Sequence, residues 1–508
     1  MEQKSSKTDS ITAGYFWTFA STALPLLSAF IVSLVVARWM GPRIVGLINW
    51  TMAVATILLI PGKFGIEGAA SRIISEYQVK APQNIGPLLI TTIRMRLLFT
   101  VPVAIGTALF APQLASFFHE ESLIPLFRIS GLMIFTVSFN ELSVLLILGL
   151  KRFRFLFAMR ILVFAIRIGI VVLTIKFALG AEGILVAYVT ATFVTALIIF
   201  LYLFRVSNTS ASDTAPLPAE SLGEIWKRLF RISAPLALSG ASVTIYSLLD
   251  KLMLGYFEGA SQVGIYSMAR NLLETSLFPI FALIMVLRPV LAGAWAEGDK
   301  ERCRVVINRS VKNSFFYSSY VVVVFASLAG PLITGLFTSE FAESAKILIL
   351  FLPLVVMRSI GAVILPGLIA ADRAGTYAKL TLMGAVTNFI LNILLIPPFG
   401  VTGAVISTLL SYLPIEFLGL RALGGAIPGF WSKGDWIKAV KILFAVALTV
   451  ALYHIFISKP VGLLFSILHA AALCVIFTCF LLLSGVMIFS ELKEIVKPFI
   501  SKMKGERH

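Results

Sequence analysis

Cysteine, histidine and acidic residues are all scarce in this sequence, and each shortage excludes a class of protein. The 508 residues include three cysteines, four histidines and 25 aspartates and glutamates. Cys303 falls in a polar stretch, and Cys474 and Cys479 share one apolar run, so no disulfide framework is expected. The histidines are scattered and lack the spacing of metal ligands. We therefore expect neither a disulfide-stapled domain nor a metal site.

Motifs for catalysis are also missing. The phosphate-binding pattern G-x-x-x-x-G-K-[ST] does not occur, because Pro61-Gly62-Lys63-Phe64 lacks both the loop and the hydroxyl. No arrangement of serine, histidine and aspartate suggests a nucleophile with its base. We therefore predict that the chain is not an enzyme, does not hydrolyse ATP and has no bound cofactor.

Apolar residues, by contrast, make up 58% of the chain, whereas charged residues make up 13%. A soluble domain of this length does not need so much apolar surface, because water would meet most of it. A helix needs about 20 apolar residues to cross the hydrocarbon core of a bilayer. The sequence therefore predicts an all-α, polytopic membrane protein with about fourteen transmembrane helices. The predicted spans are residues 13–36, 44–66, 86–110, 128–150, 156–178, 182–204, 229–256, 264–293, 311–337, 345–368, 376–397, 401–423, 437–457 and 461–488.

Positive charge is concentrated at alternate ends of these spans. The chain has 42 lysines and arginines and a net charge of +17. Basic pairs such as Lys151-Arg152 and Lys227-Arg228 follow even-numbered spans, whereas the acidic His119-Glu120-Glu121 follows an odd-numbered one. Because cytoplasmic loops are enriched in lysine and arginine, we predict a cell (inner) membrane protein with both termini in the cytoplasm. Nucleic-acid binding is not expected, because every basic stretch lies at a membrane boundary.

Two pairs of glycine motifs repeat along the chain at nearly the same offset. Residues 40–46 and 258–264 share the pattern G-x-x-x-V-G at an offset of 218, and Gly180-Ala181-Glu182-Gly183 matches Gly400-Val401-Thr402-Gly403 at an offset of 220. An offset that holds over so long a span indicates a duplicated bundle, which in a polytopic membrane protein is typical of transporters. Because each repeat has six spans, the two bundles should point the same way and enclose a cavity around a pseudo-two-fold axis.

This repeat predicts four parts along the chain. Residues 1–206 form an N-terminal six-helix bundle, and residues 229–425 form the C-terminal one. Residues 207–228 between them combine a polar linker with a helix whose apolar face suggests either an interfacial helix or the cytoplasmic start of the seventh span. Residues 426–508 add two further transmembrane helices and a basic cytoplasmic tail.

Ionisable residues inside the predicted spans are the candidates for function, because each costs about 2.5–3.5 kcal/mol on insertion scales and therefore faces a cavity or a partner. Arginine dominates the set, and its guanidinium fork suits phosphate oxygens better than a cationic drug. Arg160 and Arg288 lie near the cytoplasmic face and are interpreted as snorkelling side chains. The candidates for the substrate cavity are Arg38, Arg167, Arg270 and Arg358. The candidates for a gate or for ion coupling are Glu141, Asp250 and Glu274.

One pair of these residues could act across the bundles. At the offset of 218, Glu141 corresponds to Ser359 and Asn140 to Arg358, so the repeats place a carboxylate and a guanidinium at nearly the same depth. An ion pair between Glu141 and Arg358 would then close the cavity in one state. The alternative is that each residue pairs locally within its own bundle.

Several short stretches resemble the polysaccharide-transporter flippases of the multidrug/oligosaccharidyl-lipid/polysaccharide (MOP) exporter superfamily. The matching stretches are residues 36–42 (Val-Ala-Arg-Trp-Met-Gly-Pro), 71–77, 249–256 and 263–270. The resemblance implies a V-shaped pair of six-helix bundles, alternating access without ATP, and an undecaprenyl-type lipid pyrophosphate bearing sugars as cargo. It matches Arg38 and Arg270 best to cationic positions of the cavity. Only Lys63 stands at the end of the second span, which favours a surface-polysaccharide unit over the murein precursor.

The resemblance also implies partners and leaves competing functions open. The partners would be a lipid-linked oligosaccharide, membrane lipids, and the polymerase and glycosyltransferases of the same biosynthesis, with a proton or sodium ion for coupling. A cation-coupled multidrug exporter of the same superfamily is the first alternative, although it would favour acids and aromatics over arginines. A membrane-embedded polysaccharide polymerase or ligase is the second, although the short outer loops leave it little room for chemistry.

Overall fold

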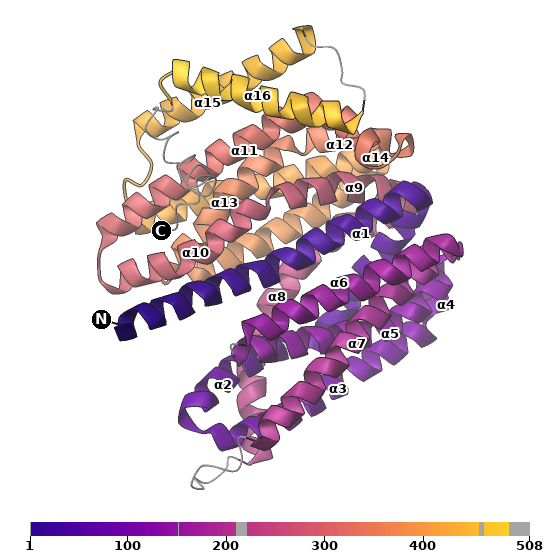
Figure 1. Ribbon diagram of the computed structural model, residues 1–508. Helices are drawn as coiled ribbons and strands as arrows, with labels where there is room; N and C mark the ends of the chain where they lie inside the picture. Colours follow the sequence, from indigo (N-terminus) through magenta and orange to yellow (C-terminus); the bar gives the residue numbers. More distant parts are fainter. Residues whose placement is uncertain (1, 151, 210–220, 457–461, 487–508) are drawn as a thin grey trace. The chain divides into compact units, whose positions relative to one another are not determined.

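The computed structural model describes residues 2–150, 152–209, 221–456 and 462–486, and every regular element among them is a helix (Figure 1). Most of the predicted linker and the basic tail lie outside these residues. The helices are α1 (Glu2–Lys63), α2 (Ile66–Lys80), α3 (Ile85–Leu109), α4 (Ala111–Phe117), α5 (Leu123–Gly149), α6 (Phe153–Lys176), α7 (Gly180–Thr209), α8 (Leu222–Glu258), α9 (Ala260–Ser276), α10 (Phe278–Ala296), α11 (Lys300–Leu336), α12 (Ala342–Leu350), α13 (Leu352–Ala370), α14 (Ala374–Ala426), α15 (Lys433–Phe456) and α16 (Leu463–Leu483). Two short 3₁₀ turns, Pro82–Asn84 and Ser339–Phe341, complete the set.

The predicted spans fall on these helices. Among the described residues, 11 helices are long and apolar enough to cross a membrane. Two of them, α1 and α14, each contain a kink and each carry two of the predicted spans. The predicted span 229–256 lies on α8, and the predicted span 264–293 is divided between α9 and α10. The predicted all-helical membrane fold is confirmed.

The repeat glycines have matching backbone conformations, which is the structural counterpart of the sequence repeat. Gly41 bends α1 with φ 72° and ψ 175°, and Gly259 separates α8 from α9 with φ 82° and ψ 179°. The second pair, Gly180 and Gly400, has φ of 62° and 54°. L-residues rarely adopt these positive φ values, so glycine is required where each repeat turns from its first span to its second and from its fifth span to its sixth.

The chain divides into two compact units. Unit 1 comprises Met1–Thr275 and Thr381–Thr408, and unit 2 comprises Ser276–Leu380 and Leu409–His508. Both α8 and α14 therefore contribute to unit 1, in which α14 takes part through its central segment. The predicted bundle boundaries remain predictions.

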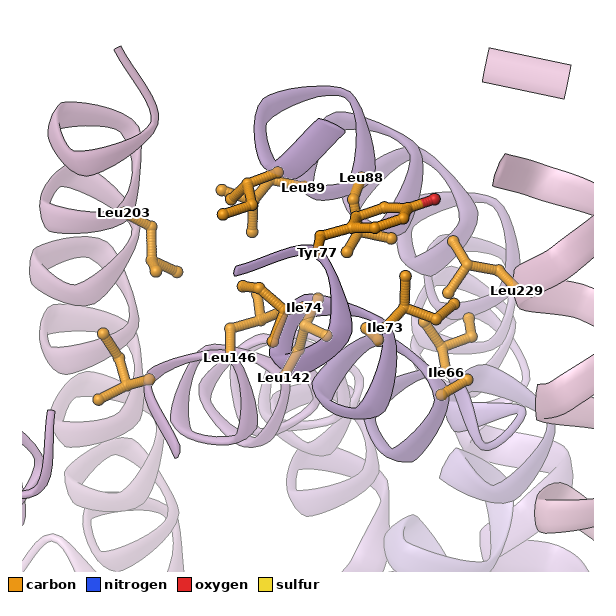
Figure 2. Close-up of a cluster of buried hydrophobic side chains, with 14 of the residues drawn as sticks. Ile66, Ile73, Ile74, Tyr77, Leu88, Leu89, Leu142, Leu146, Leu203 and Leu229 are labelled. Atoms are coloured by element: carbon orange, nitrogen blue, oxygen red, sulfur yellow. The ribbon is translucent and has the colours of Figure 1, made fainter. Parts of the chain in front are cut away.

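The core of unit 1 is built around the amphipathic helix α2 (Figure 2). Ile73, Ile74 and Tyr77 of α2 are buried among leucines of α3, α5, α7 and α8. The start of α8 joins this core through Ile225 and Leu229, both fully buried. Ser221 caps α8 in a capping box with Glu224, so the helix runs unbroken from there. The helix predicted after the linker is continuous with the helix that carries the predicted span 229–256.

In the described part of unit 2, two apolar clusters share α11. In the first, α10, α11, α13 and α14 pack around buried residues such as Leu291, Ile307 and Ile364. In the second, α15 and α16 pack on α11 through Ile442, Phe477 and their neighbours. The two helices beyond the repeat are thus held by α11.

Candidate functional site

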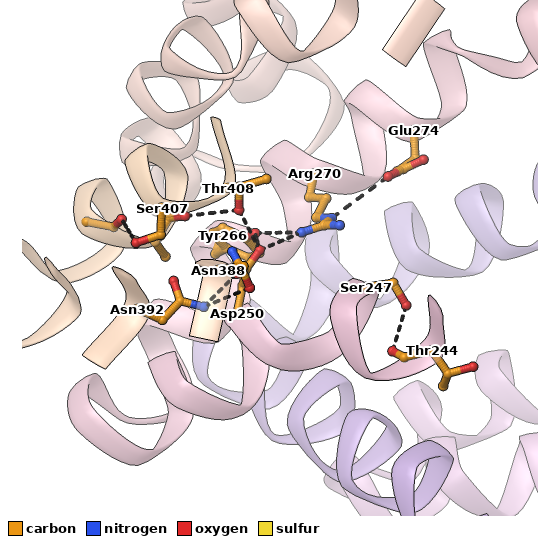
Figure 3. A network of polar contacts seen from close by, with 12 residues as sticks. Thr244, Ser247, Asp250, Tyr266, Arg270, Glu274, Asn388, Asn392, Ser407 and Thr408 are labelled. Atoms are coloured by element: carbon orange, nitrogen blue, oxygen red, sulfur yellow. Dashed lines mark hydrogen bonds and ion pairs between the residues drawn. The ribbon is translucent and has the colours of Figure 1, made fainter. Parts of the chain in front are cut away.

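A buried carboxylate on α8 is the centre of the most connected polar network in the described part of unit 1 (Figure 3). Asp250 is 1% exposed, although it lies within a predicted transmembrane helix. One of its oxygens, Oδ2, accepts hydrogen bonds from Tyr266, Arg270 and Thr408, and the other, Oδ1, accepts from Asn388 and Asn392. The donor–acceptor distances in that order are 2.6, 2.9, 2.7, 3.2 and 2.9 Å.

Helical spacing and one kink bring these donors together. Tyr266 and Arg270 are four residues apart on α9, so they lie on one face, and the Tyr266 hydroxyl is 2.7 Å from Arg270 Nη1. Asn388 and Asn392 have the same spacing on α14. Thr408 follows on the other side of the Gly400 kink, which lets the second half of α14 return to the same carboxylate.

The network is electrically balanced but crowded with donors. Arg270 neutralises Asp250 at 2.9 Å, and its Nε lies 3.8 Å from Glu274, which is one third exposed. A carboxylate offers about four lone-pair positions, and here five groups donate to it. At the same time Asn392 Oδ1 is buried without a hydrogen-bond partner among the described residues. The Asp250 carboxylate therefore has more donors than lone-pair positions, whereas the nearby Asn392 Oδ1 has no donor among the described residues.

The structure brings together three of the seven predicted residues: Asp250, Arg270 and Glu274. Sequence reasoning missed Tyr266, Asn388, Asn392 and Thr408, because it considered only side chains that carry charge. The pair of asparagines four residues apart in an apolar run was the available signal, since a buried amide also needs a partner.

The other predicted residues lie elsewhere. Arg38 is exposed, three residues before the Gly41 kink of α1. Arg167 of α6 stacks its guanidinium on the ring of Tyr188 at 4.0 Å, and its Nε is buried without a hydrogen-bond partner among the described residues.

Glu141 and Arg358 each have a neighbour of opposite charge in their own unit. Glu141 of α5 pairs with Lys63 at 2.6 Å in unit 1. Arg358 of α13 is close enough to Glu416 of α14 for electrostatic interaction in unit 2. This is the local arrangement that the sequence left open as an alternative. The pair of Glu141 with Arg358 stays a prediction for another state.

The second spans of the two repeats meet within unit 1 at a pair of equivalent glycines, Gly46 of α1 and Gly264 of α9. A Cβ on Gly46 would overlap the carbonyl oxygen of Ala260, and a Cβ on Gly264 would overlap the carbonyl oxygen of Pro42. Because Gly46 and Pro42 correspond to Gly264 and Ala260 at the offset of 218, the contact is reciprocal. Each repeat presents the same surface to the other.

Beside this contact lies a cavity of about 170 Å³ between α1, α7 and α9. Most of its wall is apolar, and Ser33, Asn49, Tyr188 and Asn271 supply the polar groups. Lys251 reaches the cavity wall from α8, since its Nζ is 3.0 Å from Asn49 Oδ1.

Residues 11–295 match the family model described as polysaccharide biosynthesis protein, which is more than half of the chain. The chain belongs to the polysaccharide biosynthesis protein family. Residues 235–395 also match the MatE family model. The resemblance to MOP-superfamily polysaccharide transporters is thereby confirmed.

Curated relatives of this family member include proteins named as flippases. It is 23% identical over 414 residues to the probable low-salt glycan biosynthesis flippase Agl15 of Haloferax volcanii, covering 80% of this chain and 83% of that one. It is 26% identical to the probable flippase AglR of the same organism, over 43% of this chain and 46% of the relative. It is 25% identical to the lipid II flippase MurJ of Bacillus subtilis, over 40% of this chain and 39% of the relative.

Solved structures share the fold. The lipid II flippase MurJ in an inward closed conformation aligns with a TM-score of 0.70 at 14% identity, covering 93% of this chain and 100% of that one. A multidrug resistance MATE family transporter of the MOP superfamily, in an inward-facing conformation, aligns with a TM-score of 0.65 at 17% identity, over 80% and 95% of the two chains. At these identities the likeness establishes the fold alone.

Proposed function

We propose that this polysaccharide biosynthesis family member is a flippase that carries a polyprenyl-pyrophosphate-linked oligosaccharide across the cytoplasmic membrane. The observation that carries this proposal is the family match over residues 11–295 on an all-helical membrane fold. The relatives named as flippases support it. Transport by alternating access would serve surface-polysaccharide synthesis, with glycosyltransferases and a polymerase as partners that supply and consume the lipid-linked sugar.

The physical demand is a polar path for the headgroup. A glycan and a pyrophosphate cannot cross about 30 Å of hydrocarbon without replacing their water. Arginines replace it well for phosphate, because the guanidinium fork donates two parallel hydrogen bonds. We assign this role to Arg38, Arg167, Arg270 and Arg358. Arg270 is bound to Asp250 here, so substrate would have to compete with that carboxylate.

Competition at Asp250 offers a way to couple transport to an ion. If Arg270 turns to the substrate, Asp250 loses its counter-charge and needs a proton or a monovalent cation. The unpartnered Asn392 Oδ1 and the Thr408 hydroxyl stand beside the carboxylate, and oxygen ligands of this kind suit a hard cation. We propose that Asp250 alternates between Arg270 and a sodium ion or proton. Glu274 and Glu141 remain further candidates for gating.

The test is transport of lipid-linked oligosaccharide in proteoliposomes and in a strain that lacks the gene. Loss of the protein should leave lipid-linked oligosaccharide on the inner leaflet. Arg270→Ala should abolish transport, and Arg270→Lys should recover only part of it, because a point charge cannot reproduce the fork. Arg288→Ala is the matched control, since Arg288 is exposed on α10. Full transport by Arg270→Ala at normal protein level would rule out the cationic site.

Coupling and topology are tested separately. Sodium and pH gradients imposed in turn on proteoliposomes should show which ion drives uptake, and Asp250→Asn should remove that dependence. Single cysteines labelled from outside should leave positions near Lys227 unmodified if the termini are cytoplasmic. Labelling of Lys227→Cys from outside would overturn the proposed topology.

A multidrug exporter is the second candidate, because residues 235–395 match the MatE model. The two functions differ in the charge they require. A cationic drug would favour acids over the four arginines assigned to the cavity. Uptake of a cationic dye that Arg270→Ala leaves unchanged, together with no change in lipid-linked oligosaccharide, would favour the exporter.

A further inference from the structure

A second cavity lies in unit 2, far along the sequence from the Asp250 network. It has a volume of about 50 Å³ and opens between residues 312–316 of α11, the loop before α15, and α15 itself. Its polar groups come from one acid, Asp435, and from Lys312, Trp431 and Lys438. Phe315, Phe316 and Ile442 belong to its apolar wall.

The acid in this cavity is already satisfied. Asp435 is 7% exposed and its Oδ1 pairs with Lys312 Nζ at 2.7 Å. Its Oδ2 accepts from the Ser432 amide at 2.9 Å, the Ser432 hydroxyl at 2.8 Å and Asn308 Nδ2 at 3.0 Å. The lysines therefore outnumber the acid, and the cavity has a net positive charge.

Two donors at the cavity have no partner among the described residues. Lys438 is half-buried and forms no ion pair there. Trp431 Nε1 is buried without a hydrogen-bond acceptor. A buried N–H left unpaired costs free energy, so such a group calls for an acceptor that the protein itself does not supply.

The surroundings of the cavity fit a lipid. On the side of α15 away from the cavity, Trp436, Ile437, Val440, Leu443 and Phe444 are more than half exposed, which is typical of a helix that faces lipid. Lys312 and Lys438 stand at the basic ends of α11 and α15, where the positive-inside rule places the cytoplasmic leaflet. Basic pockets between transmembrane helices on that side bind the headgroups of anionic lipids.

We propose that this cavity binds the phosphate headgroup of an anionic phospholipid of the cytoplasmic leaflet. Lys438 and the Trp431 indole donate to the phosphate oxygens, and Lys312 adds charge from its bridge to Asp435. The acyl chains extend from the apolar wall that Phe315, Phe316 and Ile442 form. Binding ties α15 to α11 and does not depend on what the flippase carries.

The experiment is native mass spectrometry of the purified full chain titrated with phosphatidylglycerol, phosphatidylcholine and soluble glycerol phosphate. Phosphatidylglycerol should bind more tightly than phosphatidylcholine, and glycerol phosphate should not compete. Lys438→Gln should raise the apparent Kd for phosphatidylglycerol roughly tenfold, because it removes a charged donor. Trp431→Phe should raise it roughly threefold, since it removes a neutral donor and keeps the ring. Lys438→Arg should stay within about twofold of wild type.

Lys441→Gln is the matched control. It removes the same charge one turn along α15, where Lys441 bonds to the Ser484 carbonyl outside the cavity, so binding should stay within about twofold. Unfolding temperatures of all variants without added lipid identify any that fail to fold. The proposal is overturned if wild type binds both lipids equally, if Lys441→Gln weakens binding as much as Lys438→Gln, or if glycerol phosphate competes with the lipid. Preference for polyprenyl phosphate over phosphatidylglycerol would overturn it as well.

Discussion

The Asp250 network and the 170 Å³ cavity occupy equivalent positions in the two repeats, yet their side chains differ in polarity. The network consists of charged and polar groups, whereas most of the cavity wall is apolar. At the offsets of 218 and 220, four residues of the network correspond to residues of the cavity wall. The corresponding pairs are Asp250 with Val32, Tyr266 with Ile48, Arg270 with Met52, and Thr408 with Tyr188. The second repeat thus places an ion pair and its donors where the first repeat leaves an apolar space.

This difference separates two ways in which a membrane helix can rearrange. A change at the Asp250 site requires a new partner for a buried charge, so it can be controlled by an ion or a phosphate. A change at the cavity needs mainly the repacking of apolar side chains, since no ion pair lines its wall among the described residues. Chemical control should therefore lie in the second repeat, and adaptability of shape in the first.

The largest expected loss of stability comes from removing the buried charge of Asp250. The comparison is with removal of the equivalent apolar side chain, Val32, in the first repeat. Asp250→Ala removes the buried partner of Arg270 and leaves only the partly exposed Glu274 near it, which should cost about 3–5 kcal/mol of unfolding free energy. Val32→Ala removes two methyl groups and should cost about 1.5 kcal/mol. Denaturant unfolding of the purified protein measures both. Equal losses of unfolding free energy in the two variants would show that the ion pair contributes no more to stability than apolar packing does.

The reciprocal glycine contact should respond symmetrically, in contrast to the two sites beside it. Gly46→Ala and Gly264→Ala each force a Cβ into a backbone carbonyl, and overpacking of this kind costs about 1–3 kcal/mol. The two variants should unfold at similar temperatures, several degrees below wild type. Gly106→Ala and Gly169→Ala are controls, because nothing lies within 4 Å of their Cβ positions. If only one of the two contact variants is affected, the contact is not reciprocal in solution.

Filling the cavity should stabilise the first repeat slightly. Val32→Ile adds one methylene to a wall with free space, which is worth about 0.8 kcal/mol when buried. The same change at Val243, which is 53% exposed, should alter stability by less than about 0.5 kcal/mol. Thermal unfolding in one detergent compares them. A loss of stability in Val32→Ile would mean that the cavity is too rigid to accept the methylene.

The smallest effect is expected from the ion pair of the first repeat. Lys63 and Glu141 are 27% and 40% exposed, so solvent screens their attraction. Glu141→Gln should cost about 0.5 kcal/mol, an order of magnitude below the disruption of Asp250. A double-mutant cycle with Lys63→Gln isolates the pair. A coupling above about 2 kcal/mol would place Glu141 with the buried charges after all.

Much of this architecture could be predicted from the sequence, because its causes are local. Apolar run length determines the helices, and the repeated glycines mark the turns between them, as Gly41 and Gly259 show. An ionisable side chain in an apolar helix needs a polar partner or a cavity, and this argument named Asp250, Arg270 and Glu274, which the structure brings together. Their roles in transport stay predictions.

The partners of those residues could not be predicted, because they depend on packing. Asn388 is 138 residues from Asp250, and it reaches the carboxylate only because the middle of α14 packs in unit 1. The cavity was equally hidden, since Val32 and Met52 look like any lipid-facing side chain. A cavity leaves no recognisable pattern in the sequence, whereas a buried charge appears as an ionisable residue within an apolar run.

The reciprocal glycine contact bears on how the two repeats of the chain can differ in sequence. Two identical subunits that met at this surface would have carried the same residue at both equivalent sites, so they could hold two carboxylates or none. In a single chain that contains both copies, each position can change alone. One copy carries aspartate and arginine, and the other carries valine and methionine. Two copies in one chain can therefore be symmetric where they touch each other and asymmetric at the buried ion pair.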